Sequence, residues 1–180
     1  MAPTVVLVGP PGAGKTTVGR LLAARLGLAF RDTDDDVESA AGMPVTEIFV
    51  DLGEEQFRRL EAVAVARALA EHPGVLALGG GAILDPATVD LLAGHRVVFL
   101  DVQIKDAAPR VGFNRDRPLL LGNPRAQWVR LMAARRGRYE QVASATVETG
   151  GLTADAVARR VVAVLDGLQV GPGTGPGSAR

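Results

Sequence analysis

The sequence contains no cysteine, has no net charge and has no long apolar run. The absence of cysteine excludes disulfides and thiolate metal sites. Twenty basic residues balance twenty acidic ones, whereas proteins that bind nucleic acids or membrane surfaces usually carry a basic excess. No apolar run approaches the ~20 residues that span a bilayer, and the N-terminal residues lack the basic segment of a signal peptide. We therefore expect a cytoplasmic protein that binds neither nucleic acid nor membrane.

Lysine is also scarce, because the basic residues are arginines except for Lys15 and Lys105. A codon bias toward arginine is the simplest explanation of this composition. If exposed lysines have been replaced by arginine, a lysine that remains is a candidate for a position that arginine cannot fill.

Short apolar segments alternate with amphipathic ones along the chain. Five of them have the length and composition of buried parallel strands: residues 4–8, 28–31, 75–78, 96–102 and 145–149. Strands that alternate with helices form right-handed crossovers. We therefore predict an α/β fold with three layers, α/β/α, and a five-stranded parallel sheet in one domain over residues 1–168. The remaining Gly- and Pro-rich tail, residues 169–180, has the composition of a disordered segment.

The segment GPPGAGKT, residues 9–16, follows the first predicted strand and opens a helix. It matches the phosphate-binding pattern G-x-x-x-x-G-K-[ST], in which backbone N–H groups and a helix N-terminus bind phosphate oxygens. In this pattern Lys15 reaches the β- and γ-phosphates and the Thr16 hydroxyl ligates Mg²⁺. A plain glycine turn is the alternative, but the strand–loop–helix context favours a nucleotide site. We predict that the nucleotide is bound by Gly12, Ala13, Gly14, Lys15, Thr16 and Thr17.

Other patterns narrow the class of nucleotide-binding protein. A GTPase requires a guanine-binding N-K-x-D motif, but Lys105 and Asp106 are adjacent, so the spacing fails. Motors and helicases are longer chains. The size fits a small kinase of the P-loop type, which binds Mg-ATP, positions an acceptor hydroxyl and closes over both.

Several further motifs occur in a fixed order over residues 4–165. They are GPPGAGKTT at the phosphate loop, DTD at 32–34, FRRLE at 57–61, GGGA at 79–82, RPLL at 117–120 and the pair Arg135 and Tyr139. Together they resemble the shikimate kinase family. The resemblance implies ATP-dependent, Mg²⁺-dependent phosphorylation of the 3-hydroxyl of shikimate, in the pathway to chorismate and aromatic amino acids. It also implies a monomer, substrate-binding helices at about 33–62 and a mobile lid at about 112–124.

The resemblance divides the cluster of four aspartates at residues 32–36. It implies that Asp32 helps Thr16 to hold Mg²⁺ and that Asp34 binds the acceptor hydroxyl. Two residues apart in an extended segment, Asp32 and Asp34 would point the same way. The simplest interpretation of Asp35 and Asp36 is acidic residues in a first helical turn, which the helix dipole favours.

Shikimate carries a carboxylate, which an arginine fork suits. The resemblance implies that Arg58 and Arg135 bind it, although Arg136 is adjacent and could take the second role. It also implies that the backbone of Gly79, Gly80 and Gly81 lets the ring hydroxyls approach closely. Glu61 lies one helical turn from Arg58 and could hold its fork in place.

By the same resemblance Arg117 belongs to the lid, binds the nucleotide and neutralises charge on the transferring phosphoryl group. Lys15, Asp34 and Arg117 are thus the expected catalytic residues. The resemblance also implies that Arg110 packs on the adenine face of the nucleotide, where a planar cation stacks well. Phe49 and Phe57 either line the ring pocket or belong to the core.

Two other functions remain open. One is another small-molecule P-loop kinase, such as a gluconate or nucleoside monophosphate kinase. The other is a non-catalytic ATP-binding regulator, which would need neither Asp34 nor Arg117.

Overall fold

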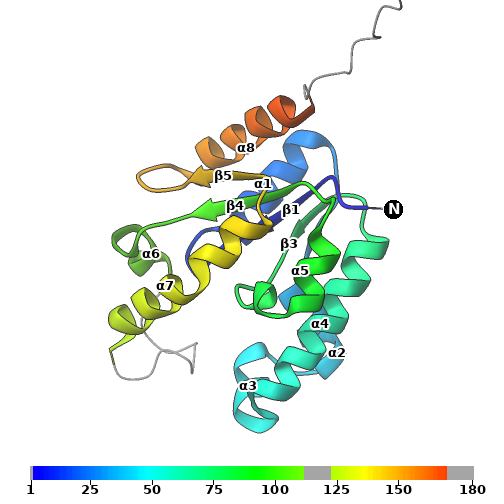
Figure 1. The fold of residues 1–180 in the computed structure, drawn as a ribbon, viewed down its shortest axis with the longest axis vertical. Coiled ribbons are helices and arrows are strands. Elements are labelled where there is room, and N and C mark those ends of the chain that lie inside the picture. The colour runs from blue at the N-terminus through cyan, green and yellow to red at the C-terminus, as the bar shows by residue number, and fades with distance from the viewer. Residues whose placement is uncertain (1, 112–122, 170–180) are drawn as a thin grey trace, which may run out of the picture.

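The sheet confirms the predicted fold class. In this computed structural model, which describes residues 2–111 and 123–169, five strands form one sheet with the order β2-β3-β1-β4-β5, and every neighbouring pair is parallel (Figure 1). The strands are β1 (Val5–Val8), β2 (Phe30–Asp32), β3 (Val75–Ala77), β4 (Val97–Asp101) and β5 (Ala145–Glu148). Because all strands point the same way, their carboxyl ends lie along one edge of the sheet.

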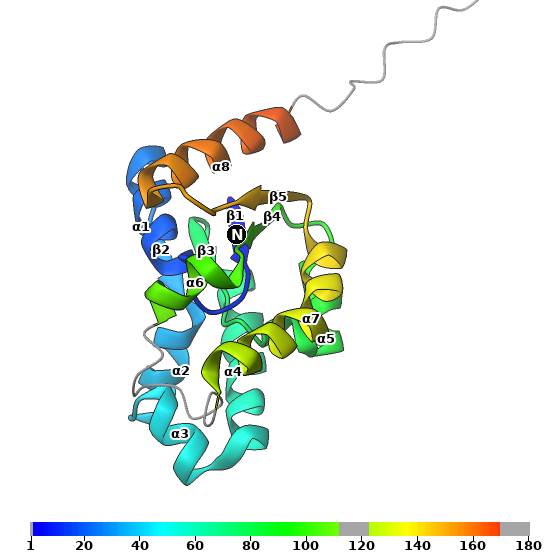
Figure 2. The same ribbon diagram turned by 90° about the vertical axis from the view of Figure 1, so that its left-hand side faces the viewer.

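Helices cover both faces of the sheet. They are α1 (Lys15–Leu26), α2 (Thr33–Ala41), α3 (Val45–Asp51), α4 (Gly53–Glu71), α5 (Pro86–Leu92), α6 (Ile104–Val111), α7 (Pro124–Val142) and α8 (Ala154–Gln169), with a 3₁₀ turn, η1 (Ala82–Leu84). Helices α1 and α8 lie on one side and α4, α5 and α7 on the other (Figure 2). This arrangement gives the three predicted layers.

The main core sits around β1, β3 and β4. The side chains of these strands have almost no exposed surface, as expected of apolar, β-branched strands buried on both faces. A second, smaller core joins α2, α3 and α4 through Val37, Ile48, Phe57 and Ala64. Helix α3 and the adjoining end of α4 extend away from the sheet (Figure 1). The predicted substrate-binding helices therefore have packing of their own.

The second strand and the helix that follows it differ from the prediction. The strand spans Phe30–Asp32 instead of residues 28–31, and α2 begins at Thr33, with no extended segment after Asp32. Asp32 is the N-cap of α2, and its carboxylate accepts a hydrogen bond from the backbone N–H of Asp34. A capping aspartate satisfies a donor that the helix leaves free, so the helix can start at once.

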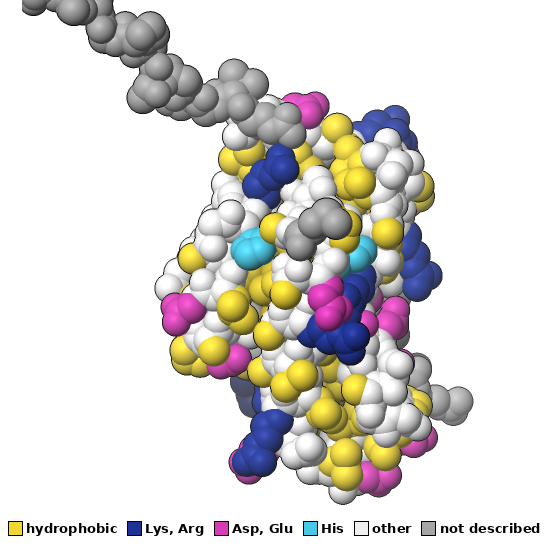
Figure 3. All heavy atoms as spheres, turned by 90° about the vertical axis from the view of Figure 1, so that its right-hand side faces the viewer, with side chains coloured by type: hydrophobic (Ala, Val, Ile, Leu, Met, Phe, Trp, Pro, Cys, Tyr) yellow, Lys and Arg dark blue, Asp and Glu magenta, His cyan; other side chains and the backbone are white. Residues whose placement is uncertain are grey.

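Charges of both signs are interspersed on one face of the molecule (Figure 3). On the face shown in Figure 3, basic and acidic side chains lie near one another and apolar side chains are scattered between them. Within the described ranges no helix is both long enough and apolar enough to cross a bilayer.

Candidate active site

The phosphate loop lies between β1 and α1, where glycine backbone conformations are required. Gly12 and Gly14 have positive φ angles of 83° and 90°. A Cβ on Gly9 would lie 2.6 Å from the carbonyl oxygen of Leu100. The Lys15 ammonium folds back over the loop and donates to the carbonyls of Gly9 (2.8 Å) and Pro10 (3.3 Å). Lys15 is therefore placed over the backbone that a bound phosphate would contact.

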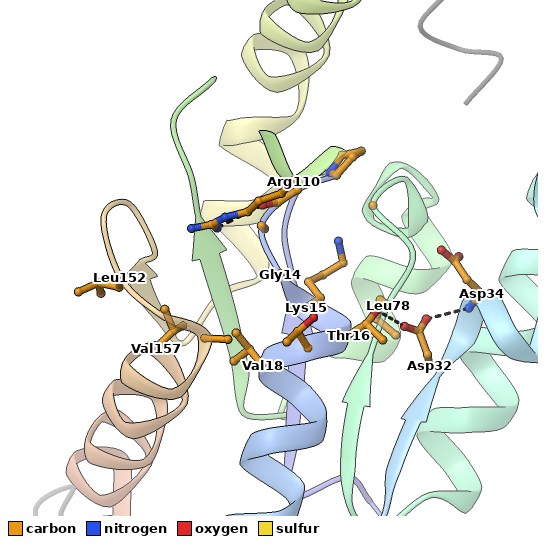
Figure 4. Close-up of a pocket in the computed structure, with 16 residues that line it drawn as sticks. Gly14, Lys15, Thr16, Val18, Asp32, Asp34, Leu78, Arg110, Leu152 and Val157 are labelled. Carbon is orange, nitrogen blue, oxygen red and sulfur yellow. Dashed lines mark hydrogen bonds between the residues drawn. The ribbon is translucent and has the colours of Figure 1, made fainter. Parts of the chain in front are cut away.

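Thr16 and Asp32 bring two hard oxygen donors together beside this loop. The Thr16 hydroxyl donates to Oδ2 of Asp32 at 2.8 Å (Figure 4). Among the described residues, no group of three or more His, Cys, Asp or Glu side chains could hold a metal on its own. Mg²⁺ is often held by one or two protein oxygens together with phosphates and water, so the Thr16 and Asp32 oxygens are donors of the kind it requires. The pair fits the predicted metal ligands.

A cavity of about 390 Å³ extends from the phosphate loop along the carboxyl edge of the sheet. The predicted nucleotide-binding residues 12–17 line it, as do Asp32, Asp34, Gly80 and Arg110 (Figure 4). Its volume falls within the range of small-ligand sites. The geometry thus brings the predicted nucleotide residues and part of the predicted acceptor site into one cavity.

The wall of this cavity next to Arg110 includes residues that the motifs did not identify. They are Leu152, Ala154 and Val157, from the connection after β5 and from α8. Arg110 itself donates to the carbonyl of Gly12 and to the hydroxyl of Thr149, both at 3.3 Å. The position of the loop after the fifth strand, at the ligand-binding edge, was the signal that could have identified them.

The glycine loop, residues 79–81, lies after β3 and packs tightly against acceptor-side residues. A Cβ on Gly79 would lie 2.5 Å from Oε1 of Glu61 and 2.6 Å from Oδ1 of Asp34. A Cβ on Gly81 would overlap the guanidinium of Arg58. Real Cβ atoms do not approach other atoms this closely, so these glycines make room for the side chains beside them.

Asp34 faces the glycine loop, but not for the reason predicted from the sequence. It lies in the first turn of α2, so the argument from an extended segment was wrong. Asp35 and Asp36 share this first turn, as expected. Asp36 pairs with Arg31 at 2.7 Å. The pKa of Asp35 is raised, first by partial burial and then by the neighbouring charge of Asp32.

Arg58 and Glu61 form an ion pair on α4, with 2.5 Å between Nη1 and Oε2. Glu61 is 3% exposed. Burial raises its pKa, and the nearby Asp34 carboxylate raises it further, while Arg58 lowers it. Phe57, beside Arg58, packs against Phe49 with ring centroids 4.3 Å apart and is buried in the smaller core. Phe57 is thus a core residue.

Arg135 and Arg136 have different surroundings on α7. Arg136 forms a two-pronged pair with Asp101, with distances of 2.7 and 2.9 Å, and this pairing raises its pKa. The Arg135 guanidinium instead lies near the glycine loop, 3.7 Å from the position of a Cβ on Gly80. Because Arg136 is committed to Asp101, the geometry favours Arg135 as the second carboxylate-binding arginine.

Tyr139, on α7, is buried behind the glycine loop. Its hydroxyl donates to the carbonyl of Gly80 at 2.6 Å, and burial raises its pKa to about 12. The predicted lid, residues 112–124, lies almost wholly outside the described residues. The predicted catalytic Arg117 is among those outside them.

Comparison with known proteins adds independent information. The family model for shikimate kinase matches residues 11–166. The chain is 57% identical to a shikimate kinase from Streptomyces coelicolor, over 94% of this chain and 97% of that protein. A shikimate kinase from Streptomyces avermitilis is 58% identical, with 93% of this chain and 96% of that protein covered.

Solved structures show the same likeness. The structure of a shikimate kinase from Acinetobacter baumannii in complex with shikimate superposes with a TM-score of 0.89 at 35% identity, covering 95% of this chain and 97% of that one. A gluconokinase from Sinorhizobium meliloti has a TM-score of 0.58 at 20% identity, covering 93% of each chain. At that identity the likeness to the gluconokinase concerns the fold alone.

Proposed function

The chain belongs to the shikimate kinase family, and we propose that its site transfers the γ-phosphoryl group of ATP to the 3-hydroxyl of shikimate, giving shikimate 3-phosphate and ADP. The observation that carries this proposal is that the two loops lie side by side and line one cavity. A Cβ on Gly80 would lie 3.4 Å from both the Gly9 carbonyl oxygen and Cδ of Pro11. The loop that binds phosphate and the loop that faces the acceptor residues are thus close neighbours, which suits direct transfer between their ligands.

On the donor side, the phosphate loop and Lys15 hold the β- and γ-phosphates. The N-terminus of α1 adds partial positive charge at the same place. The oxygens of Thr16 and Asp32 fit Mg²⁺, which neutralises charge on the phosphates when bound. Arg110 and the apolar residues of α8 and its preceding connection enclose the adenine.

On the acceptor side, Asp34 orients the attacking hydroxyl. As the new oxygen–phosphorus bond forms, the bond to the bridging oxygen of ADP breaks and the hydroxyl proton passes to the Asp34 carboxylate. Arg58 and Arg135 bind the substrate carboxylate, because a guanidinium fork matches its two oxygens. The lid residue Arg117 completes the catalytic set that we propose.

The two arginines on α7 provide a direct test of this assignment. Arg135→Ala should raise the KM for shikimate while leaving the midpoint of thermal unfolding nearly unchanged. Arg136→Ala should lower the thermal midpoint, because it removes the partner of a largely buried Asp101. The reverse pattern would show that Arg136 is the carboxylate-binding residue.

The function is tested by ADP release with Mg-ATP and each of four acceptors: shikimate, quinate, gluconate and AMP. We expect turnover with shikimate only. Turnover with gluconate or AMP would assign the chain to another small-molecule kinase. ATP binding without turnover of any acceptor would support a regulator. We further propose that the protein is a cytoplasmic monomer that acts in the pathway to aromatic amino acids. Size-exclusion chromatography tests whether it is a monomer.

A further inference from the structure

Helix α7 donates one side-chain hydrogen bond to each of the two substrate loops. The indole Nε1 of Trp128 donates to the carbonyl of Pro11 at 2.9 Å, and the hydroxyl of Tyr139 donates to the carbonyl of Gly80 at 2.6 Å. Both side chains are buried, with 3% and 1% exposed surface. Neither residue has a place in the chemistry described above.

Each hydrogen bond fixes a peptide plane in a loop that lines the cavity. The Pro11 carbonyl and the Gly12 N–H belong to one planar peptide unit, so fixing the oxygen fixes the direction of the N–H. That N–H belongs to the loop that binds phosphate. In the same way, the Gly80 carbonyl shares its plane with the N–H of Gly81, in the loop beside Arg58. The two side chains therefore set donor directions in two different loops.

The helix that carries them is itself held in place. Arg136 ties α7 to Asp101 at the end of β4. The ring of Tyr139 stacks on Phe99 of β4 with centroids 5.1 Å apart. Trp128 and Tyr139 are separated by about 16 Å along the helix at 1.5 Å per residue. One rigid element can therefore position both loops at separate points.

The phosphate loop is also confined from a second side. A Cβ on Gly12 would lie 2.6 Å from Cγ2 of Val111 and 3.0 Å from the carbonyl oxygen of Ala107, both on α6. Helix α6 thus packs against Gly12 while α7 bonds to Pro11. Helix α6 therefore limits the movement of the phosphate loop as a whole. The hydrogen bond from Trp128 then sets the orientation of the peptide unit between Pro11 and Gly12.

We propose that Trp128 is a positioning residue for ATP, acting through the Pro11 carbonyl. We propose in the same way that Tyr139 is a positioning residue for shikimate, acting through the Gly80 carbonyl and through the Arg135 guanidinium, which also hydrogen-bonds its hydroxyl. This inference rests on the proposed function. It predicts that two conservative changes on one helix weaken the use of two different substrates.

The test compares Trp128→Phe and Tyr139→Phe, each of which removes a hydrogen-bond donor and keeps most of the ring. Met132→Leu is the control, because Met132 is buried on the same helix and donates no hydrogen bond to either loop. Trp128→Phe should raise the KM for ATP roughly 3- to 10-fold, the effect of one lost hydrogen bond, and change the KM for shikimate less than about 2-fold. Tyr139→Phe should do the opposite. Thermal midpoints are measured for all three variants.

Fluorescence gives a second measurement on the unmodified protein, because Trp128 is the only tryptophan in the sequence. A non-hydrolysable ATP analogue should change the Trp128 emission with a saturable dependence on concentration. Shikimate alone should change it much less. A tryptophan that merely fills the core would respond to neither ligand.

The outcomes separate this inference from the proposed function. If the wild type phosphorylates shikimate but Trp128→Phe raises both KM values equally, or behaves like Met132→Leu, the inference is wrong. An emission that does not respond to the ATP analogue also overturns it, and this measurement decides the matter if Trp128→Phe does not fold. If the wild type does not phosphorylate shikimate, the proposed function fails, while the emission titration still tests the role of Trp128.

Discussion

Glu61→Gln tests whether a buried carboxylate holds Arg58 in position for the substrate. Glu61 has 3% exposed surface and lies 2.5 Å from Nη1 of Arg58. Its other oxygen lies against Gly79, where a Cβ would come within 2.5 Å. Glutamine preserves the shape and one acceptor oxygen but removes the charge. The change therefore weakens the ion pair without opening a cavity.

The size of the effect follows from the kind of hydrogen bond that is weakened. A hydrogen bond to a charged group contributes about 1.5–3 kcal/mol. The glutamine carbonyl still accepts from the charged guanidinium, so the bond weakens toward the lower end of this range instead of being lost. A loss of about 1–1.5 kcal/mol corresponds to roughly a 5- to 12-fold change in an equilibrium constant. We expect the KM for shikimate to rise by this factor, because Arg58 spends less time in the binding orientation. The KM for ATP should not change.

The assay is steady-state ADP release with each substrate varied in turn. Glu55→Gln is the matched control, since Glu55 pairs with Arg59 on the same helix at 2.5 Å but both side chains are exposed. An exposed pair contributes little to stability or to geometry, so the control should leave both KM values unchanged. If Glu61→Gln also leaves the KM for shikimate unchanged, Glu61 does not position Arg58.

The same variant should alter how stability depends on pH. Burial raises the pKa of Glu61 above its ordinary value of 4.5, so the folded state keeps the proton when the unfolded state has lost it. The stability that this proton contributes is fully present below pH 4.5 and is lost as the pH rises through the higher folded pKa. Glutamine does not titrate. As the pH rises above 4.5, the free energy of unfolding measured in urea should therefore fall in the wild type relative to the Glu61→Gln variant. A fall in the variant relative to the wild type would contradict the reasoning.

Three further predictions concern the loops and the metal. Gly81→Ala should raise the KM for shikimate, because its Cβ would displace the Arg58 guanidinium. The control is Gly137→Ala, in an open helical position, which should leave the kinetics unchanged and stabilise the fold by about 0.5–1 kcal/mol. Equal KM values for shikimate in the two variants would refute this prediction. Arg117→Ala should lower kcat about 10³-fold or more and Arg115→Ala far less, and equal losses would mean that the catalytic arginine is placed wrongly. Removing divalent metal with EDTA should abolish ADP release and added Mg²⁺ should restore it, so turnover that persists in EDTA would exclude the metal.

Much of the fold could be predicted because its signals are local. A run such as residues 4–8 is short, apolar and rich in β-branched residues, which is typical of a buried parallel strand. The boundary at Asp32 could not be predicted as well, because an aspartate can either end a strand or cap a helix. Here it does both, since it pairs with Ala77 in the sheet and accepts the N–H of Asp34. The packing of α2 against α4 then favours the helix that this cap begins.

The site was predictable where one short segment contains the whole chemical requirement. The phosphate loop is such a segment, because its glycines, lysine and threonine are consecutive. The wall formed by Ala154 and Val157 of α8 is not, since apolar residues in a helix have the same pattern whether they face a core or a ligand. The choice between Arg135 and Arg136 depended on Asp101, which lies far away in the sequence.

The glycine loop gives the physical reason why distant motifs must occur together. The sequence suggests that Gly79–Gly81 lets a substrate approach, but the structure shows that the space beside them is first required by Asp34, Arg58 and Glu61. Any side chain at Gly79 would displace both carboxylates, and any side chain at Gly81 would displace the arginine. The DTD, FRRLE and GGGA segments are therefore one packing unit divided among three parts of the chain. A change in one of them should alter the geometry of the other two before it affects a bound ligand.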